Sequence, residues 1–128
     1  MRVLCVDDEP VNRKVVGVML GASGIEMSEA PDAASGLRMI DAERFDVVLM
    51  DLRMPGMDGL AAIERIRARS DDRARVPVVL VTADVSIDLD ERARTAGADR
   101  LVRKPVDMTS LFDAIAQAMS ERDAFAFS

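Results

Sequence analysis

The chain has 128 residues, 49% of them hydrophobic and 31% charged, which is typical of one globular domain and excludes a disordered protein. No apolar run approaches the roughly 20 residues of a membrane span, and the short run after Met1 lacks the length and cleavage site of a signal peptide, so we expect a cytoplasmic protein without membrane insertion. The formal net charge of −6 argues against nucleic-acid binding, because Lys and Arg contacts to phosphates supply most of that affinity.

Short apolar runs alternate with segments of helical periodicity between residues 2 and 120. This alternation predicts βαβ units built around a parallel sheet. Three of the runs are almost continuously apolar, as expected of strands covered on both faces, while the second and fifth are weaker and are expected at the edges of the sheet. The five predicted strands are residues 3–6, 25–28, 47–50, 78–81 and 101–102.

Four segments repeat apolar residues at helical spacing, which predicts amphipathic helices that pack on the sheet. A fifth segment, residues 86–96, has many charges and only a thin apolar stripe, so we expect a marginal and mobile helix there. The repeating residues are Val11, Val15, Val18 and Met19, then Ala34, Leu37 and Ile40, then Leu60, Ile63 and Ile66, and finally Met108, Leu111, Phe112, Ile115 and Met119. The thin stripe consists of Leu89, Ala93 and Ala96.

Capping residues agree with these helices. Asp32 and Asp58 precede the second and third predicted helices as N-cap residues. Gly21 and Gly97 lie where the first and fourth helices should end.

We expect one domain at residues 1–120, followed by a short disordered tail at residues 121–128. The single cysteine, Cys5, lies in an apolar run and has no partner for an internal disulfide, which indicates a buried structural thiol.

Polar side chains follow directly after four of the predicted strands. Asp7 and Asp8 follow the first strand and Asp51 follows the third, while Thr82 and Lys104 follow the fourth and fifth. Ligands of open parallel sheets bind at the carboxyl ends of the strands, near the point where the strand order reverses. If these strands are neighbours, the five side chains converge on one edge of the sheet.

Such a cluster has a specific chemistry. Neighbouring carboxylates repel one another, by roughly 4 kcal/mol for a pair about 4 Å apart at an effective dielectric near 20, and a divalent cation removes this repulsion. An all-oxygen site with open positions suits Mg²⁺. Because carboxylates form aspartyl-phosphate intermediates, Asp51 is a candidate nucleophile toward a phosphoryl group, with Lys104 and the Thr82 hydroxyl neutralising charge on the transferring oxygens. Taken singly, each residue is more often a cap, strand or surface residue, and the joint placement favours a site.

Four segments resemble the receiver domain of two-component response regulators, over essentially residues 2–120. They are VLCVDDEP at 3–10, VLMDLRMPGMDG at 48–59, PVVLVTA at 77–83 and GADRLVRKP at 97–105. The resemblance implies a doubly wound (βα)5, flavodoxin-like α/β fold with a five-stranded parallel sheet of order 2-1-3-4-5. It also implies a phosphoacceptor signalling domain rather than an enzyme.

By the same resemblance, Asp51 accepts a phosphoryl group from the histidine of a kinase or histidine phosphotransfer protein. Asp8, Asp51 and the backbone carbonyl of Arg53 are the implied Mg²⁺ ligands, and Asp7 would hold the ion through water. The remaining implied roles are phosphoryl binding by Thr82, charge pairing by Lys104, and a cis peptide at Lys104-Pro105.

One position departs from the family pattern. Leu101 stands where receivers usually carry a Tyr or Phe that rotates inward as the threonine moves, so the usual switch through Thr82 and this ring is in doubt. Two routes are open: Leu101 changes rotamer in place of the ring, or the signal passes mainly through the helix at residues 86–96. We expect phosphorylation to shift that helix and to change the surface of the fourth helix, fifth strand and fifth helix, which would bind a downstream protein target.

Arg53 and Asp84 lie at positions that in this family flank the path of the hydrolytic water. Their opposite charges would bridge over an acyl phosphate and set its lifetime. The alternative is that they are two unrelated surface charges.

Three other functions are compatible with parts of this pattern. A haloacid-dehalogenase-type phosphatase needs a second Asp where Arg53 stands, and a flavodoxin-like electron carrier needs a phosphate loop rich in Gly, Ser and Thr where the acidic pair Asp7 and Asp8 stands. A phosphorylation-independent scaffold that only binds a partner is the main alternative. The sequence leaves open whether the domain acts alone or belongs to a hybrid kinase, since its DDEPVNRKV segment also resembles receivers of hybrid kinases.

Overall fold

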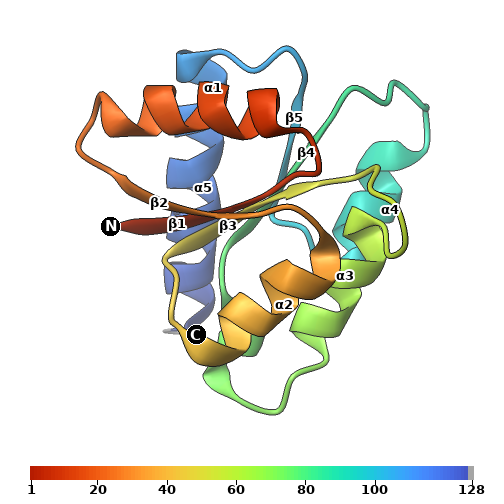
Figure 1. Cartoon of the computed structure of the whole chain (residues 1–128). Helices are drawn as coiled ribbons and strands as arrows, with labels where there is room; N and C mark the ends of the chain where they lie inside the picture. Colours follow the sequence, from red (N-terminus) through yellow and green to blue (C-terminus); the bar gives the residue numbers. More distant parts are fainter. Residues whose placement is uncertain (127–128) are drawn as a thin grey trace.

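Five parallel strands form one central sheet in the computed structural model, which describes the backbone of residues 1–126 and the side chains of residues 1–122 (Figure 1). The order β2-β1-β3-β4-β5 confirms the predicted topology. The strands are β1 (Arg2–Val6), β2 (Glu26–Ala30), β3 (Val47–Asp51), β4 (Val78–Thr82) and β5 (Arg100–Arg103).

Helices cover both faces of the sheet (Figure 1). One face packs on α1 and α5, and the other packs on α2, α3 and α4. Successive strand residues point to opposite faces. Leu49 therefore packs in the apolar cluster under α1 and α5, and Met50 packs in the apolar cluster under α2, α3 and α4. The helices are α1 (Pro10–Gly21), α2 (Ala33–Ala42), α3 (Gly59–Arg67), α4 (Leu89–Ala96) and α5 (Met108–Ala126), with a short 3₁₀ helix η1 (Asp72–Arg75) before β4.

Of the four residues predicted for the apolar face of the first helix, only Met19 packs against the core. Val11, Val15 and Val18 are 69%, 43% and 67% exposed, and α1 packs on the sheet through Val16 and Leu20 instead. The helix carries two apolar stripes, and only one of them can face the sheet. The valines therefore leave an exposed apolar stripe on α1, which we call the valine stripe.

β1, β3, β4 and β5 extend their predicted ranges by one residue at one or both ends, whereas β2 and the fourth helix are shifted. β2 is displaced toward Ala30 and includes Glu26 and Glu29, because an edge strand paired only with β1 tolerates exposed charges. The fourth helix begins at Leu89 rather than at residue 86, since the Asp84 side chain accepts hydrogen bonds from Ser86 and holds the preceding residues in a turn.

Several local predictions are confirmed. The Asp32 and Asp58 side chains accept hydrogen bonds from backbone N–H groups in the first turns of α2 and α3. Gly97 ends α4 in the left-handed conformation with φ of 110°, and Gly21 is the last residue of α1. Cys5 is buried, and this burial, followed by the charge of Asp7, raises the pKa of its thiol to about 12. The thin stripe of α4, consisting of Leu89, Ala93 and Ala96, is buried, while the mobility of that helix stays a prediction.

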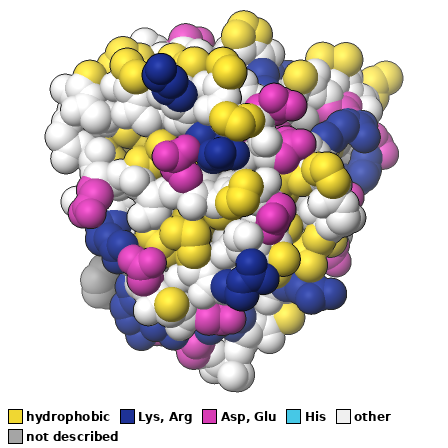
Figure 2. All heavy atoms as spheres, viewed as in Figure 1, with side chains coloured by type: hydrophobic (Ala, Val, Ile, Leu, Met, Phe, Trp, Pro, Cys, Tyr) yellow, Lys and Arg dark blue, Asp and Glu magenta, His cyan; other side chains and the backbone are white. Residues whose placement is uncertain are grey.

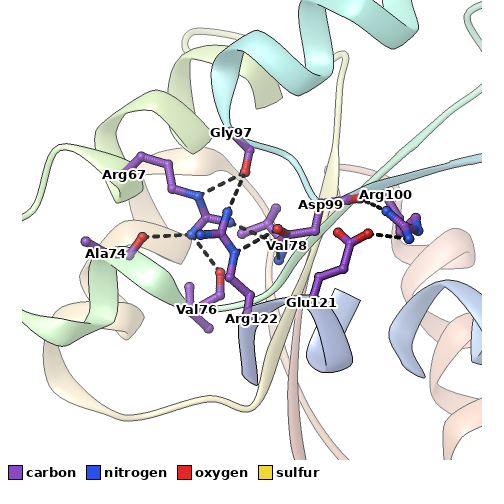
Figure 3. A network of polar contacts seen from close by, with 9 residues as sticks. All are labelled: Arg67, Ala74, Val76, Val78, Gly97, Asp99, Arg100, Glu121 and Arg122. Atoms are coloured by element: carbon purple, nitrogen blue, oxygen red, sulfur yellow. Dashed lines mark hydrogen bonds and ion pairs between the residues drawn. The ribbon is translucent and has the colours of Figure 1, made fainter. Parts of the chain in front are cut away.

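The end of the sheet opposite the carboxyl ends of the strands is held by a network around Asp99 (Figure 3). The Asp99 carboxylate accepts hydrogen bonds from Val78 N–H at 2.8 Å, from Arg67 at 3.0 Å and from Arg122 at 2.7 Å. Arg67 and Arg122 also donate to the carbonyl of Gly97. The network thus joins the C-terminal end of α4 to α3, β4 and α5.

Because Arg122 belongs to this network and Glu121 pairs with Arg100 at 2.5 Å, α5 continues as a packed element beyond the predicted boundary at residue 120. Of the predicted tail, the side chains from residue 123 onward lie outside the described residues. Among the described helices, none combines the length and apolar character needed to cross a membrane.

Candidate functional site

Four strands deliver polar side chains to one edge of the sheet. Asp7 comes directly after β1, Asp51 and Thr82 are the last residues of β3 and β4, and Lys104 comes directly after β5. β1 and β3 are neighbours, with β2 on one side and β4 and β5 on the other. The strand order reverses at this point, which is where open α/β sheets bind their ligands.

Three carboxylates form the centre of this edge. Each of Asp7, Asp8 and Asp51 offers an oxygen that lies within 4.8 Å of the other two. Asp7 and Asp51 are only 5% and 6% exposed, and Asp8 is half-buried. Burial, reinforced by the charge of Asp7, raises the pKa of Asp51 to about 6. The cluster therefore concentrates negative charge that water screens poorly.

Lys104 compensates part of this charge. Its Nζ lies 3.1 Å from Asp51 Oδ1 and 3.3 Å from Asp7 Oδ2. Burial by itself lowers the pKa of Lys104, but the hydrogen bonds and charges of Asp51 and Asp7 outweigh it and leave that pKa raised. One ammonium thus faces three carboxyl groups. The peptide bond between Lys104 and Pro105 is cis, as the resemblance implied.

Thr82 closes the cleft on the β4 side. It is 2% exposed, and its Oγ1 accepts a hydrogen bond of 3.0 Å from the backbone N–H of Asp84. Together with Asp8, Asp51 and Lys104, Thr82 lines an open cleft of about 510 Å³. The cleft can therefore admit a group that reaches Asp51 from solvent.

Arg53 and Asp84 form an ion pair at the rim of this cleft. Asp84 also accepts a hydrogen bond of 2.7 Å from the N–H of Ser86, and Arg103 donates to the Asp84 carbonyl at 2.9 Å. The Ser86 hydrogen bonds, followed by that of Arg53, lower the pKa of Asp84 to about 2. Arg53 and Asp84 are therefore paired with each other and are not two unrelated surface charges.

Leu101 lies outside the cleft. It is half-buried and packs against the apolar cluster that includes Leu89 and Ala93 of α4. The position that usually carries an aromatic ring thus contacts the core beneath α4.

One contact to the cluster is not predictable from the sequence. Arg13 of α1 donates from Nη1 to the backbone carbonyl of Asp7 at 2.7 Å. A lone arginine six residues after the acidic pair carries no signal by itself, because the contact depends on how α1 turns back over the end of β1.

Comparisons with known proteins agree with this geometry. Residues 3–116 match the model of a family described as the response regulator receiver domain. Sensor protein GacS of Pseudomonas syringae pv. syringae is 37% identical over 112 residues, which are 86% of this chain and 12% of that protein. Sensor histidine kinase RcsC of Salmonella typhi is 34% identical over 116 residues, which are 91% of this chain and 12% of that protein. The chain thus spans about an eighth of these two relatives.

Solved structures give the same result. A CheY-like receiver domain protein of Methanospirillum hungatei JF-1 matches with a TM-score of 0.85 at 28% identity, over 96% of both chains. The receiver domain of sensor histidine kinase PA1611 of Pseudomonas aeruginosa PAO1 matches with a TM-score of 0.83 at 30% identity, over 93% of this chain and 97% of that one. The PA1611 structure contains a magnesium ion coordinated in its active site cleft.

Proposed function

Because this chain belongs to the response regulator receiver domain family, we propose that it is the phosphoacceptor of a two-component or phosphorelay system, with Asp51 as the accepting residue. The observation that carries the proposal is a cluster of three carboxylates, two of which accept hydrogen bonds from the Lys104 ammonium. The cluster lies where the strand order of the sheet reverses. The main alternative, a scaffold that does not depend on phosphorylation, gives no reason for a buried carboxyl group with a raised pKa at that point.

The donor set of the cluster fits a hard divalent cation. All three side chains offer oxygen atoms, and Lys104 offsets only one of their charges. Asp8, Asp51 and the backbone carbonyl of Arg53 would hold Mg²⁺ directly, and Asp7 would hold it through water. When bound, the ion would offset charge on the phosphoryl oxygens.

In the proposed transfer, a carboxylate oxygen of Asp51 attacks the phosphorus of a phosphohistidine. The O–P bond forms as the N–P bond breaks, and the electron pair of the N–P bond stays on the imidazole nitrogen. A proton already on the other ring nitrogen, or taken up from water as the bond breaks, lets the histidine leave as neutral imidazole. The Lys104 ammonium, already 3.1 Å from Asp51, is placed to pair with a phosphoryl oxygen. The rigid end of β3 keeps Asp51 in position for the attack.

Thr82 would then report the modification. Its hydroxyl accepts the N–H of Asp84 in this structure, and we infer that the side chain turns toward Asp51 when it donates to a phosphoryl oxygen. The Asp84 N–H would lose its acceptor, so the β4–α4 connection would rearrange and shift α4, on whose core Leu101 packs. The changed surface of α4, β5 and α5 would bind a downstream protein target.

The Arg53–Asp84 pair would prolong the phosphorylated state. It lies at the rim of the cleft that contains Asp51, where a bridge over the acyl phosphate obstructs the approach of water.

We further propose that the phosphodonor is a sensor histidine kinase or a histidine phosphotransfer protein, in the cytoplasm. The similarity to two sensor kinases supports such a donor. The valine stripe of α1 supports docking of a protein donor beside the cleft, since Val11 lies in the first turn of α1, two residues after Glu9, which lines the cleft. Figure 2 shows hydrophobic side chains gathered along the upper edge of the molecule, where α1 lies.

Phosphotransfer from a radiolabelled histidine kinase tests the proposal. Label should pass to the wild-type chain in the presence of Mg²⁺ and should not pass to Asp51→Asn. Asp88→Asn, which changes an exposed carboxylate just before α4, should accept label normally. Equal labelling of wild type and Asp51→Asn would contradict the assignment of the acceptor.

A further inference from the structure

The turn that carries the acidic pair is fixed through its backbone. The N–H of Asp7 donates to the carbonyl of Ala30 in β2 at 3.1 Å. The Asp7 side chain accepts a hydrogen bond of 2.9 Å from the N–H of Glu9. The Asp7 carbonyl, which begins the peptide unit leading to Asp8, is held by Arg13 at 2.7 Å.

Arg13 reaches this carbonyl as a largely buried side chain. It is 16% exposed, and its Nε donates to Glu29 of β2 at 3.0 Å while its Nη1 donates to Asp7. The planar guanidinium offers these donors in one fixed geometry, which a lysine ammonium cannot reproduce. Arg13 therefore ties α1, the end of β1 and the edge strand β2 together at the start of the acidic turn.

Repulsion between carboxylates destabilises this turn. Asp7 and Asp8 are adjacent in sequence, and their carboxylates share the cluster with Asp51. Mutual repulsion favours a turn in which one of the carboxylates swings toward solvent, and half-buried Asp8 has room to do so. A fixed carbonyl at Asp7 limits the rotation of the peptide unit between the two residues and so opposes that movement.

We propose that Arg13 is a positioning residue for the metal site: it holds the Asp7–Asp8 peptide unit so that both carboxylates face the cluster, and thereby sets the affinity for Mg²⁺. The inference rests on the proposed function, because it concerns the same carboxylates. It goes further by assigning a role to a residue that touches neither the phosphoryl group nor the ion.

A role for Arg13 through its charge and a role through positioning the turn predict opposite changes in Mg²⁺ affinity when Arg13 is replaced. If Arg13 acted only through its positive charge, its removal would make the cluster more negative and Mg²⁺ would bind more tightly. If it acts by positioning, its removal frees the turn and Mg²⁺ binds more weakly. Groups that orient metal ligands typically change metal affinity by about 10- to 100-fold, and we expect about tenfold here because Arg13 acts through the backbone.

The test is isothermal calorimetry of Mg²⁺ binding to the full chain. Arg13→Gln should raise the dissociation constant about tenfold, and Arg13→Lys, which keeps the charge but not the fork of donors, should also raise it. The matched control is Lys14→Gln, which removes a neighbouring charge from an exposed position of the same helix and should leave binding unchanged or slightly tighter. In acetyl phosphate labelling, the Arg13→Gln variant should need more Mg²⁺ for half-maximal rate but reach the wild-type rate at saturation.

Equal or tighter binding by a folded Arg13→Gln variant would overturn the positioning role while leaving the metal site intact. A lowered maximal rate at saturating Mg²⁺ would also overturn it, because damage would then extend to the reacting groups. If wild type itself bound no Mg²⁺, the proposed metal site would fail, and the inference would fail with it. If Arg13→Gln does not fold, Arg13→Lys and hydrogen exchange of the Asp8 and Glu9 amides, expected to be faster in the variant, decide the question.

Discussion

Replacing Asp51 by Asn should stabilise the protein in the absence of Mg²⁺, although it removes the proposed acceptor. The pKa of Asp51 rises from about 4 in an unfolded chain to about 6 in the fold, because of burial first and the charge of Asp7 second. The folded state therefore binds the proton more tightly than the unfolded state does. Ionised Asp51 is a destabilising group, and Asn removes its charge at nearly constant shape.

The magnitude follows from this pKa difference. A shift of about 2 units corresponds to about 3 kcal/mol, since each unit is worth about 1.4 kcal/mol. Because the folded pKa is the higher one, the stability contributed by Asp51 is greatest below pH 4 and is lost as the pH rises from about 4 to about 6. At pH 7.5 the full penalty applies, so Asp51→Asn should raise the free energy of unfolding by about 1 to 3 kcal/mol, the lower figure allowing for the lost bond to Lys104.

Urea denaturation with a chelator measures this effect at pH 7.5 and at pH 4. The gain from Asp51→Asn should shrink toward zero at pH 4, where both side chains are neutral. Asp88→Asn, at the exposed position just before α4, should change the free energy of unfolding by less than about 0.5 kcal/mol. Mg²⁺ at about 100 times its dissociation constant should stabilise wild type by about 2.7 kcal/mol and the variant far less. A loss of stability in Asp51→Asn at pH 7.5, or a gain that does not depend on pH, would refute the reasoning.

Three further predictions concern residues around and opposite the cleft. Arg53→Ala or Asp84→Ala should shorten the lifetime of the phosphorylated protein severalfold, because either change opens the ion pair at the rim; unchanged decay of label in both variants would discard the bridge. Asp99→Ala should lower the free energy of unfolding by about 3 kcal/mol, since it leaves two largely buried guanidinium groups without their carboxylate. The folded variant should still accept label. A free energy of unfolding in urea equal to that of wild type would contradict the network in Figure 3. Amide hydrogen exchange across residues 84–105 should change when beryllofluoride and Mg²⁺ are added, and an identical pattern would exclude the switch through α4.

Most of the sheet could be predicted from the sequence because its central strands leave little ambiguity. β3 and β4 are buried along their whole length, and a continuous apolar run that ends in a polar residue marks both the strand and its functional end. The convergence of Asp7, Asp51 and Lys104 then follows from strand order alone, since parallel strands bring their carboxyl ends to one edge.

The features that could not be predicted depend on which of several equivalent surfaces meets a neighbour. Periodicity showed that α1 is amphipathic but did not distinguish the stripe of Val11 from that of Val16 and Leu20. The boundaries of β2 could not be predicted accurately, because its exposed glutamates interrupt the apolar pattern expected of a strand. The contact between Arg13 and Asp7 joins a helix side chain to a backbone carbonyl. Every residue has such a carbonyl, so the residue types in the sequence do not indicate this contact.

The most direct test of the central claim is the intact mass of the chain after incubation with acetyl phosphate and Mg²⁺, beside Asp51→Asn and a chelated sample. Phosphoryl transfer to Asp51 predicts one phosphoryl adduct on wild type, none on the variant and none without Mg²⁺. An adduct of equal yield on Asp51→Asn would contradict the account, and so would wild type that carries no adduct from acetyl phosphate or from a phosphohistidine donor while still binding a partner.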